Sequence, residues 1–259
     1  LIIGAGPAGL SAATLASEHG LSVLLLDEQG APGGQIYRNI EHNDANDPET
    51  CAILGAEYTY GAALASACRQ TVVTYTPNAT VWRIDPDGTV AYSIDGAART
   101  VRGHRVILAT GAMERPVPIP GWTMPGVMTA GAAQTLLKSS AMLPAGRLVV
   151  AGAGPLAMLV TQQLIAAGAD VAALLETTRK RDYITNVMSL PQALPGLEYL
   201  RRGLAMRRAI RASGVPIYSG VTALAARGGD RLASVRFREN GERIAIDIDT
   251  LLLHDGVVP

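Results

Sequence analysis

The stretch Leu1-Ile2-Ile3-Gly4-Ala5-Gly6-Pro7-Ala8-Gly9 decides the fold of this chain. Its apolar start predicts a strand, and its glycines predict a tight turn that leads into a helix. Such a turn directs free backbone N–H groups and the positive end of the helix dipole at one place, where a pyrophosphate is stabilised. A second apolar strand, Val23–Leu26, ends at Asp27. An acid there can accept hydrogen bonds from a ribose hydroxyl, and we favour Asp27 over its neighbour Glu28.

The same pattern returns later in the chain as Gly152-Ala153-Gly154-Pro155-Leu156-Ala157, after the apolar run Leu148–Ala151. Alanine in place of the third glycine is still compatible with the fingerprint. The strand Val171–Leu175 follows and ends at Glu176. Two such β-α-β units predict two bound nucleotides.

Composition is that of an α/β protein. The chain has 259 residues, of which 48% are hydrophobic, and 22 basic residues balance 22 acidic ones. Zero net charge gives no reason to expect binding to nucleic acid or to an anionic membrane. No uninterrupted apolar run reaches the roughly 18–20 residues of a membrane span, so we expect a cytoplasmic protein that only its partners could hold at a membrane. The chain starts inside a strand without Met, which suggests cut ends.

Cysteines and histidines exclude two kinds of chemistry. The two cysteines, Cys51 and Cys68, form no CxxC pair and are expected on one helix, Thr50–Gln70. A dithiol that exchanges electrons with a flavin needs two adjacent sulfurs, so we do not expect a disulfide reductase. The four histidines lack metal-binding spacing. We therefore expect no metal site, and we assign no catalytic acid or base.

The remaining elements follow from hydrophobic periodicity and turn residues. We expect an exposed loop at Arg38–Pro48, a buried-type strand at Arg105–Ala109, a proline-rich boundary within Pro116–Pro125, and a strand at Thr250–His254 that crosses back into the first domain. Further strands are expected at Val72–Tyr75, Thr80–Ile84, Thr89–Ile94, Arg99–Val101 and within Pro216–Ile248, with helices at Ala130–Ser140 and Leu197–Ala212.

The order of these parts resembles the FAD-dependent oxidoreductases with two dinucleotide-binding domains. The first fingerprint, Asp27, Gly33-Gly34-Gln35 and Ala109-Thr110-Gly111 match that family in order and spacing, and the resemblance covers the whole chain. It implies an α/β fold with two Rossmann-like domains of the three-layer ββα type, the second inserted into the first. The domains would be residues 1–117 for FAD, 118–249 for the second nucleotide, and 250–259 as a return strand. The C-terminal part of the FAD domain would be missing.

Narrower phrases point to one branch of this family. Pro32-Gly33-Gly34-Gln35-Ile36-Tyr37-Arg38, the segment Gly121–Ala132 and His254–Pro259 look like the A or alpha subunit of bacterial opine oxidases. The B subunit of hydrogen cyanide synthase and the alpha subunit of heterotetrameric sarcosine oxidase are related. The resemblance implies a hetero-oligomer that oxidises a small-molecule amine or amino acid, with a separate amine-oxidase-type beta subunit.

The resemblance also implies site residues. For FAD these are Gly4, Gly6, Pro7, Ala8, Gly9, Asp27, Glu28, Gly33, Gly34, Gln35, Arg38, Val81, Ala109, Thr110, Gly111 and Ala112. For the second nucleotide they are Gly152, Gly154, Pro155, Leu156 and Glu176. Glu176 favours NAD, whereas the following Arg179-Lys180-Arg181 could hold the 2′-phosphate of NADP, and some relatives bind another adenine nucleotide there. The sequence does not choose among these.

Three functions fit these residues. The first is the flavoprotein subunit of an amine or amino-acid oxidase or dehydrogenase complex. The second is a stand-alone NAD(P)H-dependent flavin reductase of the thioredoxin-reductase-like type, without a redox-active disulfide. The third is a scaffold that holds its nucleotides only structurally.

Overall fold

The computed structural model describes residues 1–178 and 196–259, and the chain divides into two compact units. Unit 1 comprises residues 1–112, 138–141 and 259; unit 2 comprises residues 113–137 and 142–258. The change of unit therefore falls after Ala112, whereas the sequence predicts a domain boundary after Val117.

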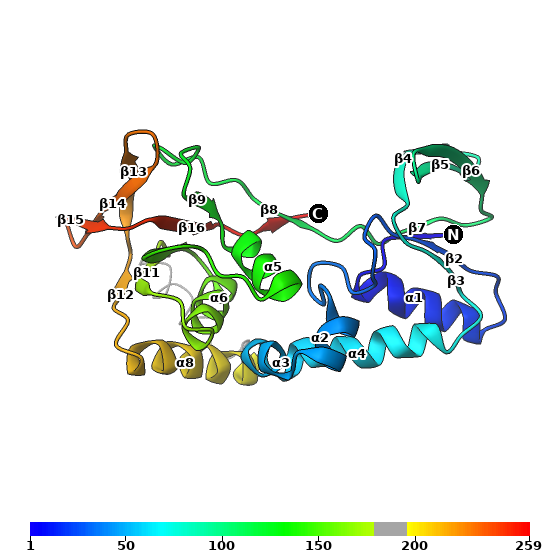
Figure 1. Cartoon of the computed structure of the whole chain (residues 1–259), viewed down its shortest axis with the longest axis horizontal. Coiled ribbons are helices and arrows are strands. Elements are labelled where there is room, and N and C mark those ends of the chain that lie inside the picture. Colours follow the sequence, from blue (N-terminus) through cyan, green and yellow to red (C-terminus); the bar gives the residue numbers. More distant parts are fainter. Residues whose placement is uncertain (179–195) are drawn as a thin grey trace. The chain divides into compact units, whose positions relative to one another are not determined.

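Unit 1 is built on a parallel sheet of four strands in the order β3-β2-β1-β7 (Figure 1). Its helices are α1 (Pro7–Glu18), α2 (Ile40–Asn46), α3 (Pro48–Leu54) and α4 (Ala56–Arg69). Its strands are β1 (Ile2–Ile3), β2 (Leu24–Leu26), β3 (Thr74–Thr76), β4 (Thr80–Ile84), β5 (Thr89–Ile94), β6 (Ala97–Arg102) and β7 (Ile107–Leu108). The last helical residues of α5 (Ala130–Ser140) belong to this unit as well.

The alternation of side chains along β1 and β2 produces the three layers of unit 1. Ile2 and Leu25 pack with Leu10 of α1 and Cys68 of α4 on one face of the sheet. Ile3 and Leu26 pack with Val90 on the other face, under the antiparallel meander β4-β5-β6. This is the predicted ββα arrangement.

Unit 2 repeats the plan with a parallel sheet of five strands in the order β12-β11-β10-β16-β9. Its helices are α5, α6 (Pro155–Ala166) and α8 (Leu197–Ala212). Its strands are β8 (Met113–Glu114), β9 (Val127–Thr129), β10 (Leu148–Gly152), β11 (Val171–Glu176), β12 (Ile217–Ser219), β13 (Thr222–Gly228), β14 (Leu232–Glu239), β15 (Glu242–Asp247), β16 (Thr250–His254) and β17 (Val257–Val258).

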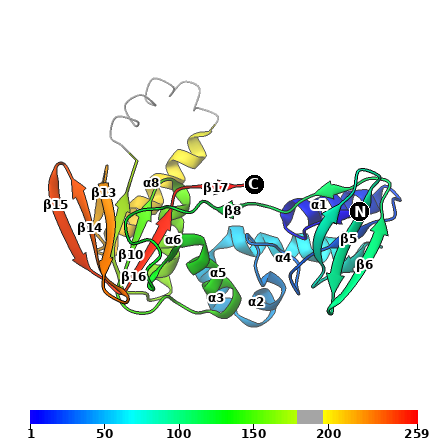
Figure 2. The same ribbon diagram turned by 90° about the horizontal axis from the view of Figure 1, so that it is seen from above.

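Strand β10 shows the same alternation as β1. Leu148 and Val150 pack toward the helices with Val160 of α6. Val149 and Ala151 pack on the opposite face, in a cluster that includes Phe237 of the antiparallel meander β13-β14-β15. Figure 2 shows this meander and the helices α6 and α8 on opposite sides of the sheet.

Two predictions for unit 1, one of a loop and one of a helix, need correction. The polar segment expected as an exposed loop contains α2, because Ile40 and Asn43 are buried and the Asn43 Nδ2 group donates to the Tyr58 hydroxyl at 2.8 Å. The helix expected over Thr50–Gln70 is two helices, α3 and α4. Gly55 separates them with a backbone φ of 85° and ψ of 174°, which no helix allows.

Two strand predictions are also wrong. Strand β7 is not buried: Ile107 and Leu108 are 45% and 62% exposed, because β7 lies at the edge of its sheet. Strand β16 does not cross back into unit 1. It pairs in parallel with β10 and β9 inside the sheet of unit 2, and its apolar side chains contribute to both cores there.

Candidate nucleotide-binding sites

In unit 1 the first fingerprint turns from β1 into α1. Gly4 has a φ of 101°, and a Cβ there would lie 2.3 Å from the carbonyl oxygen of Ala109. A Cβ on Gly9 would lie 1.8 Å from the Gly4 oxygen. Gly6 is different, because among the atoms that the structure describes a Cβ there would meet only the Gly34 Cα, at 3.9 Å. Gly4 and Gly9 thus allow close packing, while Gly6 leaves the turn open for a ligand to approach the backbone, beside Pro7 and Ala8 at the start of α1.

Asp27 is tied to this turn by its carboxylate. Its Oδ2 accepts a hydrogen bond from the Ala5 amide, and its Oδ1 accepts one from the Gln29 amide at 2.6 Å. The Asp27 side chain is buried, whereas Glu28 is exposed. The geometry therefore favours Asp27 over Glu28 as the acid of the first site. Sequence patterns do not identify Ala5 as its partner.

Gly33 and Gly34 bring a second loop against the fingerprint. The Gly33 amide donates to the Ala5 oxygen at 2.8 Å, and a Cβ on Gly34 would lie 2.8 Å from the Gly6 Cα. Both glycines have positive φ. Within the described residues the Nε of Arg38 is buried and has no hydrogen-bond partner, although its Nη1 donates to the side chain of Gln29. An acceptor on a bound ligand would satisfy this donor, which fits an anionic cofactor such as FAD.

Gln35 has a buried neighbour that the sequence patterns do not reveal. Lys138, counted with unit 1, donates from its Nζ to the Gln35 carbonyl oxygen at 3.2 Å, and it lies 5.8 Å from the centre of the Tyr58 ring. Burial, with a smaller effect from the positive charge of Arg38, lowers the pKa of Lys138 to about 8.

The remaining predicted residues of unit 1 contribute mainly backbone. The Ala109 amide donates to the Ile3 oxygen at 2.8 Å, and Thr110, Gly111 and Ala112 continue past the end of β7. Val81 lies in β4 with its side chain against the core of the meander. The backbone of Asp27 is hydrogen-bonded on this side to two residues: the Ala79 amide donates to the Asp27 carbonyl oxygen at 2.8 Å, and the Asp27 amide donates to the Thr76 oxygen at 3.1 Å.

In unit 2 the second fingerprint lies at the end of β10. A Cβ on Gly152 would lie 2.0 Å from the His254 oxygen. Gly154 has a φ of 86°, and a Cβ there would meet no described residue within 4 Å. Ala157, at the third-glycine position, is buried in the core, so the extra methyl group is accommodated. A pocket of about 240 Å³ lies over this turn. Its lining is Gly152, Gly154, Pro155, Ala157, Met158, Leu174, Glu176 and Thr178, while Leu156 is half-buried beside it.

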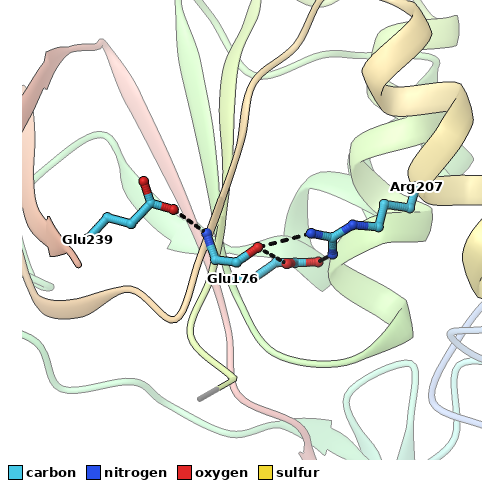
Figure 3. A network of polar contacts seen from close by, with 4 residues as sticks. Glu176, Arg207 and Glu239 are labelled. Carbon is cyan, nitrogen blue, oxygen red and sulfur yellow. Dashed lines mark hydrogen bonds and ion pairs between the residues drawn. The ribbon is translucent and has the colours of Figure 1, made fainter. Parts of the chain in front are cut away.

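Glu176 is held in a polar network that the sequence does not reveal (Figure 3). Its Oε1 pairs with the Nη1 of Arg207, and its Oε2 accepts a hydrogen bond from the Ser219 hydroxyl at 2.7 Å. The Nη2 of Arg207 donates to the same hydroxyl at 2.9 Å, and Glu239 accepts from the Ser219 amide at 2.8 Å. The basic residues expected to compete with Glu176, Arg179 to Arg181, lie outside the described residues.

One of the four histidines is also part of this region of unit 2. His254 is buried, and its Nδ1 lies 2.5 Å from Glu114 Oε1, while Glu114 Oε2 accepts from the Gly131 amide at 2.7 Å. It is thus a core histidine with a partner, located where β16 meets the second fingerprint. Cys51 and Cys68 are free and buried, and they lie on different helices.

The match to a known family spans the entire chain. The model of the pyridine nucleotide-disulphide oxidoreductase family matches residues 1–259, and the chain belongs to this family. The chain therefore has the fold of that family, which binds FAD and NAD(P).

The A subunit of opine oxidase from Rhizobium meliloti is 40% identical over 267 residues, which cover 100% of this chain and 50% of that protein. The hydrogen cyanide synthase subunit HcnB from Pseudomonas aeruginosa is 34% identical, over 96% of this chain and 53% of that protein. The chain spans about half the length of these curated relatives.

Solved structures share the fold. The crystal structure of T. acidophilum thioredoxin reductase matches this chain with a TM-score of 0.67 and 18% sequence identity. The match covers 100% of this chain and 76% of the chain of that reductase. Within residues 1–178 and 196–259, no helix is both long and apolar enough to span a bilayer.

Proposed function

We propose that this chain is part of the flavoprotein A or alpha subunit of an opine-type amine oxidase or dehydrogenase complex. The observation that carries the proposal is the 40% identity to the A subunit of opine oxidase over the full chain. The second relative is also named as a subunit, of hydrogen cyanide synthase. The buried, separated cysteines fit this function better than that of a disulfide reductase.

FAD would bind in unit 1. The open turn at Gly6 and the start of α1 would face its pyrophosphate, and Asp27 would accept from its adenosine ribose. Gly33, Gly34 and Arg38 would line the inner part of the cofactor. When bound, FAD supplies the electron-accepting chemistry, while these residues bind and orient it. The pocket of unit 2 would hold NAD(P) or another adenine nucleotide.

The substrate would be a small secondary amine or amino acid, bound by a separate subunit of amine-oxidase type. Its oxidation removes two electrons and two protons and forms an imine, which water then hydrolyses to an amine and a carbonyl compound. The electrons would pass through the FAD of this protein to a further acceptor. This division of roles fits a chain whose candidate site residues would all serve nucleotide binding.

Reconstitution with the partner tests this proposal. The complete protein is purified with and without an amine-oxidase-type subunit encoded next to it, and an opine is added under anaerobic conditions. We expect the flavin absorbance of this protein to bleach only in the complex, and to bleach less when Asp27→Ala has lowered its FAD content. Turnover of the opine by this protein without its partner would overturn the proposal.

A stand-alone NAD(P)H-dependent flavin reductase is the second candidate, favoured by the pocket at the second fingerprint and by the thioredoxin-reductase fold. Stopped-flow mixing of the FAD-loaded protein with NADH or NADPH separates the two functions. Bleaching of the flavin band on the timescale of one turnover supports the reductase, and an unchanged band supports the complex.

A further inference from the structure

The acids of the two fingerprints lie in different electrostatic surroundings. Asp27 accepts hydrogen bonds from two neutral backbone amides, and within the described part of the chain no ion pair to it is found. Glu176 is paired with the guanidinium of Arg207. The first site therefore offers a ribose an anionic acceptor, whereas the charge of the second acid is balanced by the protein itself.

The pair at the second site is well defined. The side chains of Glu176 and Arg207 are 8% and 25% exposed, so water screens the interaction little. Ser219 bonds to both partners and completes a closed set of three contacts (Figure 3). Arg207 lies on α8, and Ser219 ends β12, next to β11 in the sheet. The carboxylate thus has both oxygens engaged before any ligand arrives.

Only Glu176 of this pair lines the pocket over the second fingerprint. An unpaired acid at this position repels a 2′-phosphate and accepts from a 2′-hydroxyl, which selects NAD. An acid neutralised by a guanidinium repels a 2′-phosphate only weakly and is a weaker acceptor for a 2′-hydroxyl. Arg207 therefore acts on a ligand through Glu176.

We propose that Arg207 is a positioning residue that sets the nucleotide selectivity of the second pocket: by neutralising Glu176, it lets the pocket accept a ribose with a 2′-phosphate as well as one with a 2′-hydroxyl. The inference rests on the proposed second nucleotide site. It predicts that the pocket does not distinguish NAD from NADP through its acid, although an acid stands in the NAD-type position.

Calorimetric titration of the FAD-loaded complete protein with NAD⁺ and NADP⁺ tests the proposal through the ratio of the two dissociation constants. We expect the wild-type ratio to lie within about tenfold of one. Arg207→Met should shift the ratio toward NAD⁺ by about tenfold or more, because Glu176 then faces the ligand as an unpaired anion. Arg207→Lys, which keeps the positive charge beside Glu176, should keep the wild-type ratio. Arg208→Met is the matched control, since Arg208 is exposed on the same helix, and should change nothing.

A second variant keeps the test decisive if Arg207→Met does not fold. Glu176→Gln leaves the guanidinium without its counter-ion and should shift the ratio toward NADP⁺ by about tenfold. Arg179 to Arg181 are present in every variant, so they cannot cause a difference between variants.

The outcomes distinguish a failure of this inference from a failure of the proposed second nucleotide site on which it rests. A wild-type preference for NAD⁺ of more than about a hundredfold, or a ratio that neither Arg207→Met nor Glu176→Gln changes, overturns the role of Arg207. If neither coenzyme binds while FAD is retained, the second nucleotide site itself is wrong, and the role of Arg207 falls with it.

Discussion

At the residue scale, Asp27 and Glu176 stand at equivalent positions of two similar units, yet their partners differ. Asp27 is bonded to the turn that would carry the pyrophosphate, through the Ala5 amide. Glu176 is bonded to a cation and a hydroxyl from other elements. The same local sequence pattern therefore ends in an acid bound by backbone amides in unit 1 and in an acid paired with an arginine in unit 2.

Removing the Asp27 carboxylate should weaken FAD binding. Charge-assisted hydrogen bonds contribute about 1.5–3 kcal/mol, so Asp27→Ala should lower FAD affinity by about ten- to a hundredfold. Titration followed by flavin fluorescence measures the effect. Glu28→Ala, a change at an exposed neighbour, should leave FAD affinity unchanged. Equal losses in both variants would show that Asp27 is not the ribose acid.

The two thiols should make stability depend on pH. Burial raises the pKa of the Cys51 and Cys68 thiols above their ordinary value. Above about pH 8.5 the unfolded chain loses thiol protons that the folded chain keeps, so these groups lower the free energy of unfolding as pH rises. Urea unfolding at pH 7 and pH 9.5 should therefore show a larger loss for wild type than for the Cys51→Ala/Cys68→Ala variant. If the free energy of unfolding fell equally in both proteins, folding would not raise the pKa of these thiols.

At the element scale, two helical glycines, one in α1 and one in α8, have opposite effects on stability. Gly9 lies in α1 with no room for a methyl group, because its Cβ would collide with the Gly4 oxygen. Gly203 lies in α8, and a Cβ there meets no atom of the described residues within 4 Å. The first glycine is required for helix-to-strand packing, and the second only lowers helix propensity.

Alanine at these two positions should change stability in opposite directions. Gly203→Ala should raise the free energy of unfolding by about 0.5–1 kcal/mol, since alanine is the better helix former. Gly9→Ala should lower it by about 1–3 kcal/mol, the usual result of overpacking. Thermal melts of the two variants beside wild type measure both effects. Stabilisation by Gly9→Ala would mean that α1 can move away from β1 without cost.

At the scale of the whole molecule, each unit has its own apolar cores. Those of unit 1 lie on the two faces of the sheet around β1, and those of unit 2 lie on the two faces around β10. Both cysteines belong to unit 1. Their reactivity therefore reports the opening of that unit.

FAD should protect the thiols, and NAD(P)⁺ should not. A ligand present at a hundred times its dissociation constant stabilises the folded state by about 2.7 kcal/mol, so labelling of Cys51 and Cys68 by a thiol reagent should slow by up to about a hundredfold with FAD. In the Asp27→Ala variant, the protection should shrink at the same FAD concentration. Protection by NAD⁺ or NADP⁺ alone would contradict the assignment of FAD to unit 1.

The sequence by itself determined the two β-α-β units and much of the secondary structure. Glycine turns and alternating apolar residues are local signals, so the fingerprints, β4, β5, α5 and α8 could be predicted with their bounds. Polar segments carry weaker signals. The helix α2 could not be predicted because only Ile40 and Asn43 are buried along it. The predicted crossing of Thr250–His254 into the first domain is wrong because an apolar strand does not encode which neighbours it pairs with.

Only the tertiary structure decided the electrostatics of the second site. Glu176 and Arg207 lie 31 residues apart in the chain, and Glu114 and His254 lie 140 apart. Local sequence placed an acid at the end of β11, but its charge is balanced only because α8 packs beside α6 and brings Arg207 to it. Spacing along the chain predicts the glycine turn that would receive a pyrophosphate. The pairing of buried charges depends on which distant elements fold against that turn, because a charge is compensated by whatever lies within a few ångströms in space.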